Sequence, residues 1–216
     1  MSKDKELRDT IEEALDWEPG IDSAHIGIAV TNGIVTLSGH VASYTEKLAV
    51  ERAVARLRGV KGIAEELVVR LPHETKRSDD EIAERARKIL AWDTTVPDDK
   101  IGIKVEHGRV TLNGQVDHFF QRAAAERDVQ KLGGVTGVVN LIAVRPPVRS
   151  PVVREQITSA LMRDAVLDAA GITVSTQGDR VVLDGQVGSW RERLVAEQAA
   201  WATAGVAEVE NRLVVA

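Results

Sequence analysis

The 216-residue sequence contains no cysteine, which excludes both a disulfide framework and a thiolate metal site. Aromatic residues are scarce as well, because four Trp, one Tyr and two Phe make up only 3% of the chain. Large cores usually depend on aromatic rings, since each ring buries much surface. We therefore expect small cores filled by Val, Ile, Leu and Ala.

Long apolar runs are also missing from the sequence. No stretch approaches the roughly 18 apolar residues of a membrane-spanning helix. The first residues, MSKDKELRDT, are charged and lack the apolar segment of a secretory signal. These features predict a soluble, cytoplasmic protein. A net charge of −5 disfavours general nucleic-acid binding, which usually requires a basic domain.

What the sequence does contain is one unit written three times. The segments VTLSGHV, VTLNGQV and VVLDGQV place Gly39, Gly114 and Gly185 in register, 75 and 71 residues apart. Sliding the chain by these offsets aligns three segments without a gap. We expect three domains of 68 residues each, and call them repeats 1, 2 and 3: residues 3–70, 78–145 and 149–216.

Each repeat predicts the element order α-β-β-α-β. A helical apolar period comes first (LRDTIEEALDW in repeat 1), and two stretches of alternating apolar residues around a glycine turn follow. A second helix then begins near Ser43, His118 or Ser189, and a short apolar strand closes the unit. A crossover helix makes the second and third strands parallel. The expected fold class is therefore α+β, with a three-stranded mixed sheet and two helices on one face.

Two sets of glycines recur at the same position of each repeat. Gly39, Gly114 and Gly185 lie within the second strand, where glycine marks a bulge or another backbone passing close by. The other set fits the left-handed residue that ends a helix and consists of Gly59, Gly134 and Gly205. We interpret both sets as structural.

The element order, the V-x-L-x-G-x-V strand and the Gly-Val turn into the last strand resemble the BON domain, named for bacterial OsmY and nodulation proteins. The resemblance covers all three repeats. It implies a non-enzymatic domain of the kind found in osmotic-stress proteins and associated with phospholipid surfaces. One cytoplasmic relative takes part in potassium binding, so the resemblance also leaves a potassium ion open as a ligand.

Motifs of catalysis are not visible in the sequence. The five His residues form no H-x-x-x-H or H-E-x-x-H spacing, and no phosphate-binding glycine loop is present. The Gly59-Val60-Lys61-Gly62 segment matches the GXXG loop of KH domains only poorly, because it joins a helix to a strand. We therefore expect no enzyme activity, no catalytic or metal-binding residues and no cofactor.

The rings recur at two positions of the repeat. Trp17 and Trp92 end the first helix, where we expect them in a core or in packing between domains. At the start of the second helix, an aromatic residue precedes a basic residue by three positions, as an anchor at a membrane interface would. These candidates for lipid or partner contact are Tyr44 with Lys47, Phe119 and Phe120 with Arg122, and Trp190 with Arg193. The alternative is that each ring closes one end of its core.

The sequence leaves three functions open. The first is a stress-related module that contacts an anionic membrane surface or an envelope-associated protein. The second is a cytoplasmic potassium sensor, and the third is a scaffold that associates with itself. The sequence does not decide the ligand, the oligomeric state or the arrangement of the domains.

Overall fold

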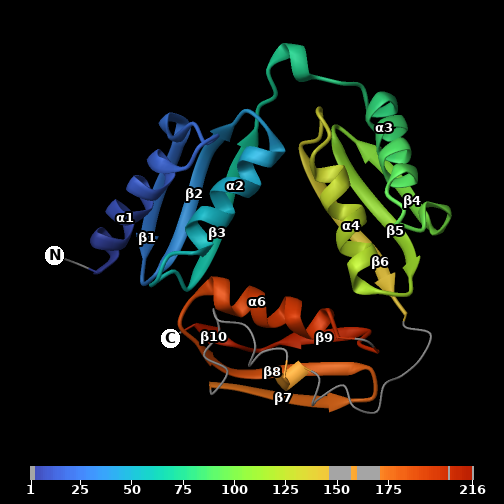
Figure 1. The fold of residues 1–216 in the computed structure, drawn as a ribbon. Helices are drawn as coiled ribbons and strands as arrows, with labels where there is room; N and C mark the ends of the chain where they lie inside the picture. The colour runs from blue at the N-terminus through green and yellow to red at the C-terminus, as the bar shows by residue number, and fades with distance from the viewer. Residues whose placement is uncertain (1–2, 146–156, 160–170, 204, 216) are drawn as a thin grey trace. The chain divides into compact units, whose positions relative to one another are not determined.

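The computed structural model describes residues 3–145, 157–159, 171–203 and 205–215. Its helices and strands occur in three successive groups, one in each repeat (Figure 1). Each group is described by itself below.

Repeat 1 contains two helices and three strands in the expected order. Their bounds are α1 Lys3–Trp17, β1 Ile26–Thr31, β2 Ile34–Val41, α2 Tyr44–Ala55 and β3 Gly62–Val69. The sheet has the order β1-β2-β3, so the central strand is the second in sequence. Asn32 and Gly33 at the tip of the β1–β2 hairpin both have positive φ, as a tight two-residue turn requires.

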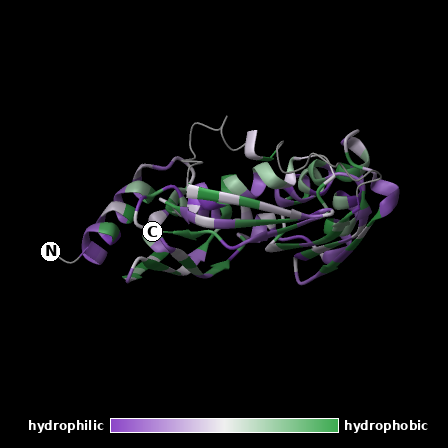
Figure 2. Cartoon of the chain, turned by 90° about the horizontal axis from the view of Figure 1, so that it is seen from below, coloured by the Kyte–Doolittle hydropathy of each residue, from purple (hydrophilic) through white to green (hydrophobic). Residues whose placement is uncertain are grey.

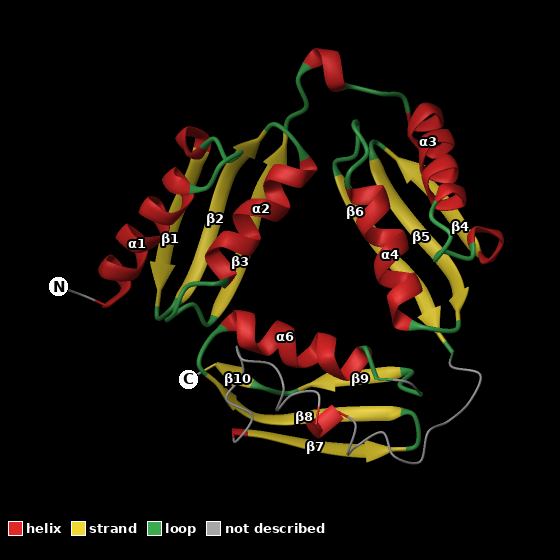
Figure 3. Ribbon diagram, viewed as in Figure 1, coloured by secondary structure: helices red, strands yellow, loops and turns green. Residues whose placement is uncertain are grey.

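Repeat 2 has the same plan. Its elements are α3 Asp79–Trp92, β4 Ile101–Glu106, β5 Arg109–Val116, α4 Phe119–Gln130 and β6 Gly137–Val144. The outer strands pair with β5 differently, since β4 is antiparallel to it and β6 is parallel to it. Helices α3 and α4 pack on each other and on one face of the sheet (Figure 3). The predicted fold class, a mixed three-stranded sheet with helices, is confirmed.

Repeat 3 repeats the hairpin and the crossover, with one difference at its end. Its elements are β7 Ile172–Gln177, β8 Arg180–Val187, α6 Trp190–Trp201, β9 Glu208–Asn211 and β10 Val214–Val215. Both β9 and β10 pair parallel with β8, so the last strand is interrupted between them. The expected first helix of this repeat, around residues 153–162, lies largely outside the described residues. Ile157, which is described, is fully buried in this core.

Hydrophobic and hydrophilic residues alternate along the strands, as the colours of Figure 2 show, and one set of apolar side chains in each repeat is buried. Among the described residues, every buried hydrophobic side chain is Ala, Val, Leu or Ile. The largest fully buried ones include Ile11 and Leu15 in repeat 1 and Ile82 and Leu90 in repeat 2. The prediction of small aliphatic cores is therefore confirmed.

The glycines within the second strands all have positive φ, with values of 108° at Gly39, 135° at Gly114 and 129° at Gly185. A Cβ atom at any of them would overlap a carbonyl oxygen of the strand or loop alongside, that of His25, Lys100 or Gly171. The position therefore accepts only glycine for two reasons, its backbone angle and its space.

Candidate functional site

The aromatic residue that we predicted as a contact position is the first residue of the second helix in all three repeats. Residues before the helix fix its start: the backbone N–H of Glu46 donates to the hydroxyl of Ser43 at 3.1 Å, and that of Glu192 donates to Ser189 at 3.2 Å. In repeat 2 the cap is His118, with the Gln121 side chain accepting a hydrogen bond from the His118 N–H at 3.0 Å. The sequence thus places Tyr44, Phe119 and Trp190 at one helix start each.

The ring at this position is half-buried in every repeat, and Trp190 shows what surrounds it. Trp190 packs against the buried core of repeat 3. The guanidinium carbon of Arg193, one helical turn later, lies 5.0 Å from the centre of its ring. This distance is typical of a cation–π contact. The aromatic–basic pair predicted from the spacing therefore forms within one repeat.

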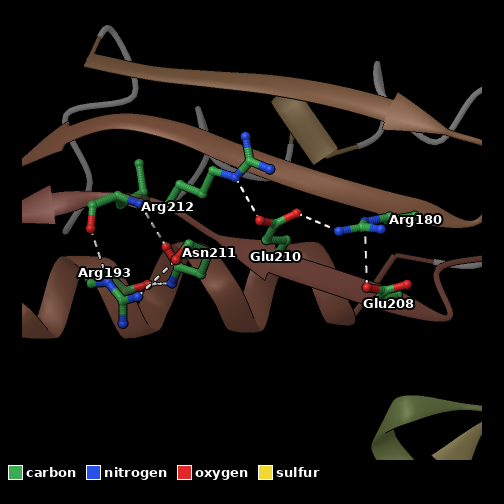
Figure 4. Close-up of polar contacts among 7 residues, drawn as sticks. Arg180, Arg193, Glu208, Glu210, Asn211 and Arg212 are labelled. Atoms are coloured by element: carbon green, nitrogen blue, oxygen red, sulfur yellow. Dashed lines mark hydrogen bonds and ion pairs between the residues drawn. The ribbon is translucent and has the colours of Figure 1, made fainter.

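The guanidinium of Arg193 is also fastened to the backbone of the last strand (Figure 4). Its Nε donates to the carbonyl of Leu213 at 3.0 Å, and its Nη2 donates to the carbonyl of Asn211 at 2.8 Å. In repeat 2, the Nη2 of Arg122 lies 3.5 Å from the carbonyl of Asn140. The basic residue thus joins the second helix to the strand behind it, in addition to any outside contact.

Sequence reasoning missed a residue that completes this arrangement. The side-chain amide of Asn211 donates to the carbonyl of Arg193 at 3.2 Å and to the carboxylate of Glu197 at 3.0 Å, and its oxygen accepts from the N–H of Leu213 at 3.2 Å. Asn140 repeats all three bonds in repeat 2. Repeat 1 has Glu65 at this position. The available signal was an asparagine at the same position of the last strand in repeats 2 and 3.

Exposure distinguishes repeat 2 from the others at the helix start. Phe120, next to the half-buried Phe119, is 56% exposed. Its ring stacks on that of His118, with 5.4 Å between the ring centres and 13° between the planes. In repeat 1, Tyr44 and Lys47 are both half-buried.

The expectation for Trp17 and Trp92 was wrong as far as a core is concerned. Trp17 is 79% exposed and Trp92 is 87% exposed, so neither ring belongs to the core of its repeat. Each is the last residue of its helix, one turn or less beyond a buried leucine, Leu15 or Leu90. The structure therefore exposes large apolar rings at the one aromatic position that we had expected to be buried.

The outward face of the repeat 3 sheet carries a cluster of four charged residues, of which Glu210 and Arg212 stand where repeat 2 has apolar residues (Figure 4). Arg180 contacts Glu210 at 2.6 Å and Glu208 at 3.4 Å, and Arg212 contacts Glu210 at 2.7 Å. Hydrogen bonds from Arg212 and then Arg180 lower the pKa of Glu210. The matching face of repeat 2 presents Val139 and Leu141 instead.

Within the described part of the chain, no three His, Asp or Glu side chains come together as a metal site would require. A search of the same residues for a helix of the length and apolarity needed to cross a bilayer found none. At Asp128, burial, followed by a hydrogen bond with Asp93 and its charge, raises the pKa.

Comparison with known proteins agrees with the internal repeats. The model of the BON domain matches residues 3–70, 78–146 and 151–216. No curated protein matches the chain.

Two solved structures are also similar to the chain. One is described as CdsD, the structural protein of the type III secretion system of Chlamydia trachomatis, C-terminal domain; it is 18% identical over 97% of each chain, with a TM-score of 0.27. A second CdsD structure is 18% identical over 98% of this chain and 92% of its own, with a TM-score of 0.26. Both TM-scores are low, and we draw no conclusion about this chain from them.

Proposed function

Since this chain belongs to the BON domain family, we propose that it is a non-enzymatic protein that binds phospholipid surfaces. The family match supports a binding role, because BON domains are non-catalytic binding domains known for binding phospholipids. In this proposal the three domains are residues 3–70, 78–145 and 149–216, close to the three matched ranges. Three weak contacts on one chain would add up to a stronger one through avidity.

The observation that carries the proposal is the exposure of large apolar rings in repeat 2. Trp92 is 87% exposed and Phe120 is 56% exposed, and rings of this size gain much from leaving water. Trp in particular is favoured at the depth of lipid headgroups. Trp17, at 79%, offers the same side chain in repeat 1.

The predicted contact residues at the starts of the second helices remain part of the proposal. They are Tyr44, Lys47, Phe119, Phe120, Arg122, Trp190 and Arg193. Phe120 is the strongest of them, because it is the most exposed ring of the set and follows directly on the capped helix start. The guanidinium groups of Arg122 and Arg193 already contact backbone carbonyls. We therefore propose that their main role is to position the ring, and that contact with lipid headgroups is secondary.

Vesicle co-sedimentation of the full chain tests the proposal. We expect binding to vesicles of phosphatidylcholine with phosphatidylglycerol, and a loss of about tenfold in affinity when Trp92→Ser and Phe120→Ser are combined, since each ring buries much apolar surface in the interface. The matched control is Leu141→Ser, which removes an apolar side chain 63% exposed on the sheet of the same repeat. Absence of binding by the unaltered chain, or an equal loss in the control, would contradict the proposal.

A stress-related role and a cytoplasmic location complete the proposal. The stress-related role rests on the family match. Fractionation of cells before and after an osmotic upshift, with the chain followed by antibody, tests them together. An unchanged amount of protein after the upshift would count against the stress role, and recovery outside the cytoplasm would count against the location.

A further inference from the structure

Repeat 1 contains a groove that is lined by none of the predicted lipid-contact residues. It has a volume of about 690 Å³ and lies among the start of α1, the tip of the β1–β2 hairpin and the segment that follows α2. Pockets of this volume accommodate small polar molecules. Three basic side chains line it, Lys3, Arg58 and Lys61, and we call it the basic groove.

The walls of the basic groove are held by hydrogen bonds. The carboxylate of Asp4 accepts from the backbone N–H of Asn32 at 2.9 Å and from that of Gly33 at 3.1 Å. The N–H of Lys61 donates to the carbonyl of Gly33 at 2.9 Å. The hairpin tip is therefore held against both α1 and the chain that follows α2.

The three cations have no counter-charge of their own within the described part of the chain. None of Lys3, Arg58 and Lys61 forms an ion pair or a side-chain hydrogen bond with a described residue, and all three are exposed. Two carboxylates, Asp4 and Glu6, also line the groove, against three cations. The cations therefore outnumber the acids, and the excess charge is positive.

Repeat 2 shows that the fold does not need these cations. Its hairpin tip is held by the same bonds: Asp79 accepts from the N–H of His107 and of Gly108, both at 2.8 Å, and the N–H of Thr136 donates to Gly108 at 2.9 Å. The positions equivalent to Lys3, Arg58 and Lys61 are there Ser78, Gly133 and Thr136. Because the same turn forms without charge, the three cations of repeat 1 are free to serve a ligand.

We propose that the basic groove binds a phosphate monoester or diphosphate group. A planar guanidinium and two ammonium groups match the several oxygens of a doubly charged phosphate better than a single carboxylate. The groove lies in repeat 1 and is lined by none of the exposed rings of repeat 2. Two sources offer this group, a soluble phosphorylated compound and a lipid headgroup with a terminal phosphate.

Calorimetric titration of the full chain with inorganic pyrophosphate at low ionic strength tests the site. The informative variant combines Lys3→Ser, Arg58→Gly and Lys61→Thr, which gives repeat 1 the residues with which repeat 2 folds. We expect this variant to bind pyrophosphate about tenfold more weakly or worse, because charge-assisted bonds dominate such a site. In the unaltered chain, we expect amide NMR signals of Gly33, Gly59 and Lys61 to shift on titration.

A control variant removes the same charge from exposed positions of another part of the chain, through Lys76→Ser, Arg85→Ser and Arg87→Ser. An equal loss in this control, or no pyrophosphate binding by the unaltered chain, would overturn the proposal. Vesicles separate the two sources: preference for phosphatidic acid over phosphatidylglycerol, lost in the groove variant, supports a lipid headgroup, and pyrophosphate binding without that preference supports a soluble compound. The Trp92 and Phe120 variants should leave pyrophosphate binding unchanged, so this result and the vesicle result can fail separately.

Discussion

The side-chain amide of Asn140 on β6 donates a hydrogen bond of 3.0 Å to the carboxylate of Glu126 on α4, and Asn211 and Glu197 form the same bond at 3.0 Å in repeat 3. In both repeats the asparagine also bonds the carbonyl of the basic residue one turn earlier on the helix. These bonds fix the position of the second helix relative to the last strand.

We expect Asn140→Leu to destabilise repeat 2 by about 1 to 3 kcal/mol, because the half-buried carbonyl, carboxylate and N–H groups that it bonds would lose a partner. Hydrogen exchange of peptides from α4 and β6 in the full chain measures the change locally. Asn113→Ala on the exposed face of the same sheet is the control and should leave the exchange rates as they are. Equal protection in both variants would show that the bond does not contribute.

The order of elements, the sheet topology and the aliphatic cores could all be predicted, because periodicity and caps are local properties of a sequence. The role of Arg193 could not be predicted, because its partners are the backbone carbonyls of Asn211 and Leu213. Every residue has such a carbonyl, so the residue types do not reveal the contact. Trp17 was misplaced for a different reason. Helical spacing tells which way a side chain points, but not whether another layer of the fold lies beneath the last turn.

The glycine within the second strand of each repeat allows a test of backbone strain. Gly114→Ala should destabilise repeat 2 by at least about 2 kcal/mol, since a left-handed φ and an overlap with the carbonyl of Lys100 act together. Gly133→Ala is the matched control, because a Cβ there meets no atom within 4 Å. Urea unfolding followed by hydrogen exchange of β5 peptides compares the two, and similar midpoints would contradict the strain argument.

Replacing Arg193 by Lys tests whether the guanidinium fork is needed. We expect a loss of about 1 to 2 kcal/mol in repeat 3, because an ammonium group cannot bond both the Asn211 and Leu213 carbonyls while covering the ring of Trp190. Unfolding is followed by fluorescence after Trp17 and Trp92 are changed to Phe, which leaves two Trp, both in repeat 3. The control, Arg191→Lys at an exposed position, should not move the transition; if both variants behave alike, the fork is unimportant.

Asp128 predicts a pH dependence that belongs to repeat 2. This carboxyl is 8% exposed, and among described residues its Oδ2 atom has no hydrogen-bond donor. The groups that face it are Asp93 at the end of α3, Arg127 on α4 and Lys131 at the end of α4. The ammonium of Lys131 lies 3.9 Å from Oδ1 of Asp128. Hydrogen bonds from Thr95, by contrast, lower the pKa of Asp93, so Asp128 is the first of the two carboxyls to bind a proton as the pH falls.

The sign of the effect follows from the raised pKa of Asp128 in the folded state. The folded chain holds this proton more tightly than the unfolded chain, so the stability of repeat 2 falls as pH rises from the ordinary value of 3.8 through the raised pKa. Asp128→Asn keeps a donor toward Asp93 at every pH. It should therefore stabilise repeat 2 at pH 7 by about 1 kcal/mol, the cost of one buried polar atom without a partner, and the gain should shrink as the pH falls.

Hydrogen exchange of α4 between pH 3.8 and 7 measures this gain, with Asp99→Asn, an exposed position, as the control. A gain that is independent of pH, or one that Asp99→Asn reproduces, would show that the proton on Asp128 is not responsible.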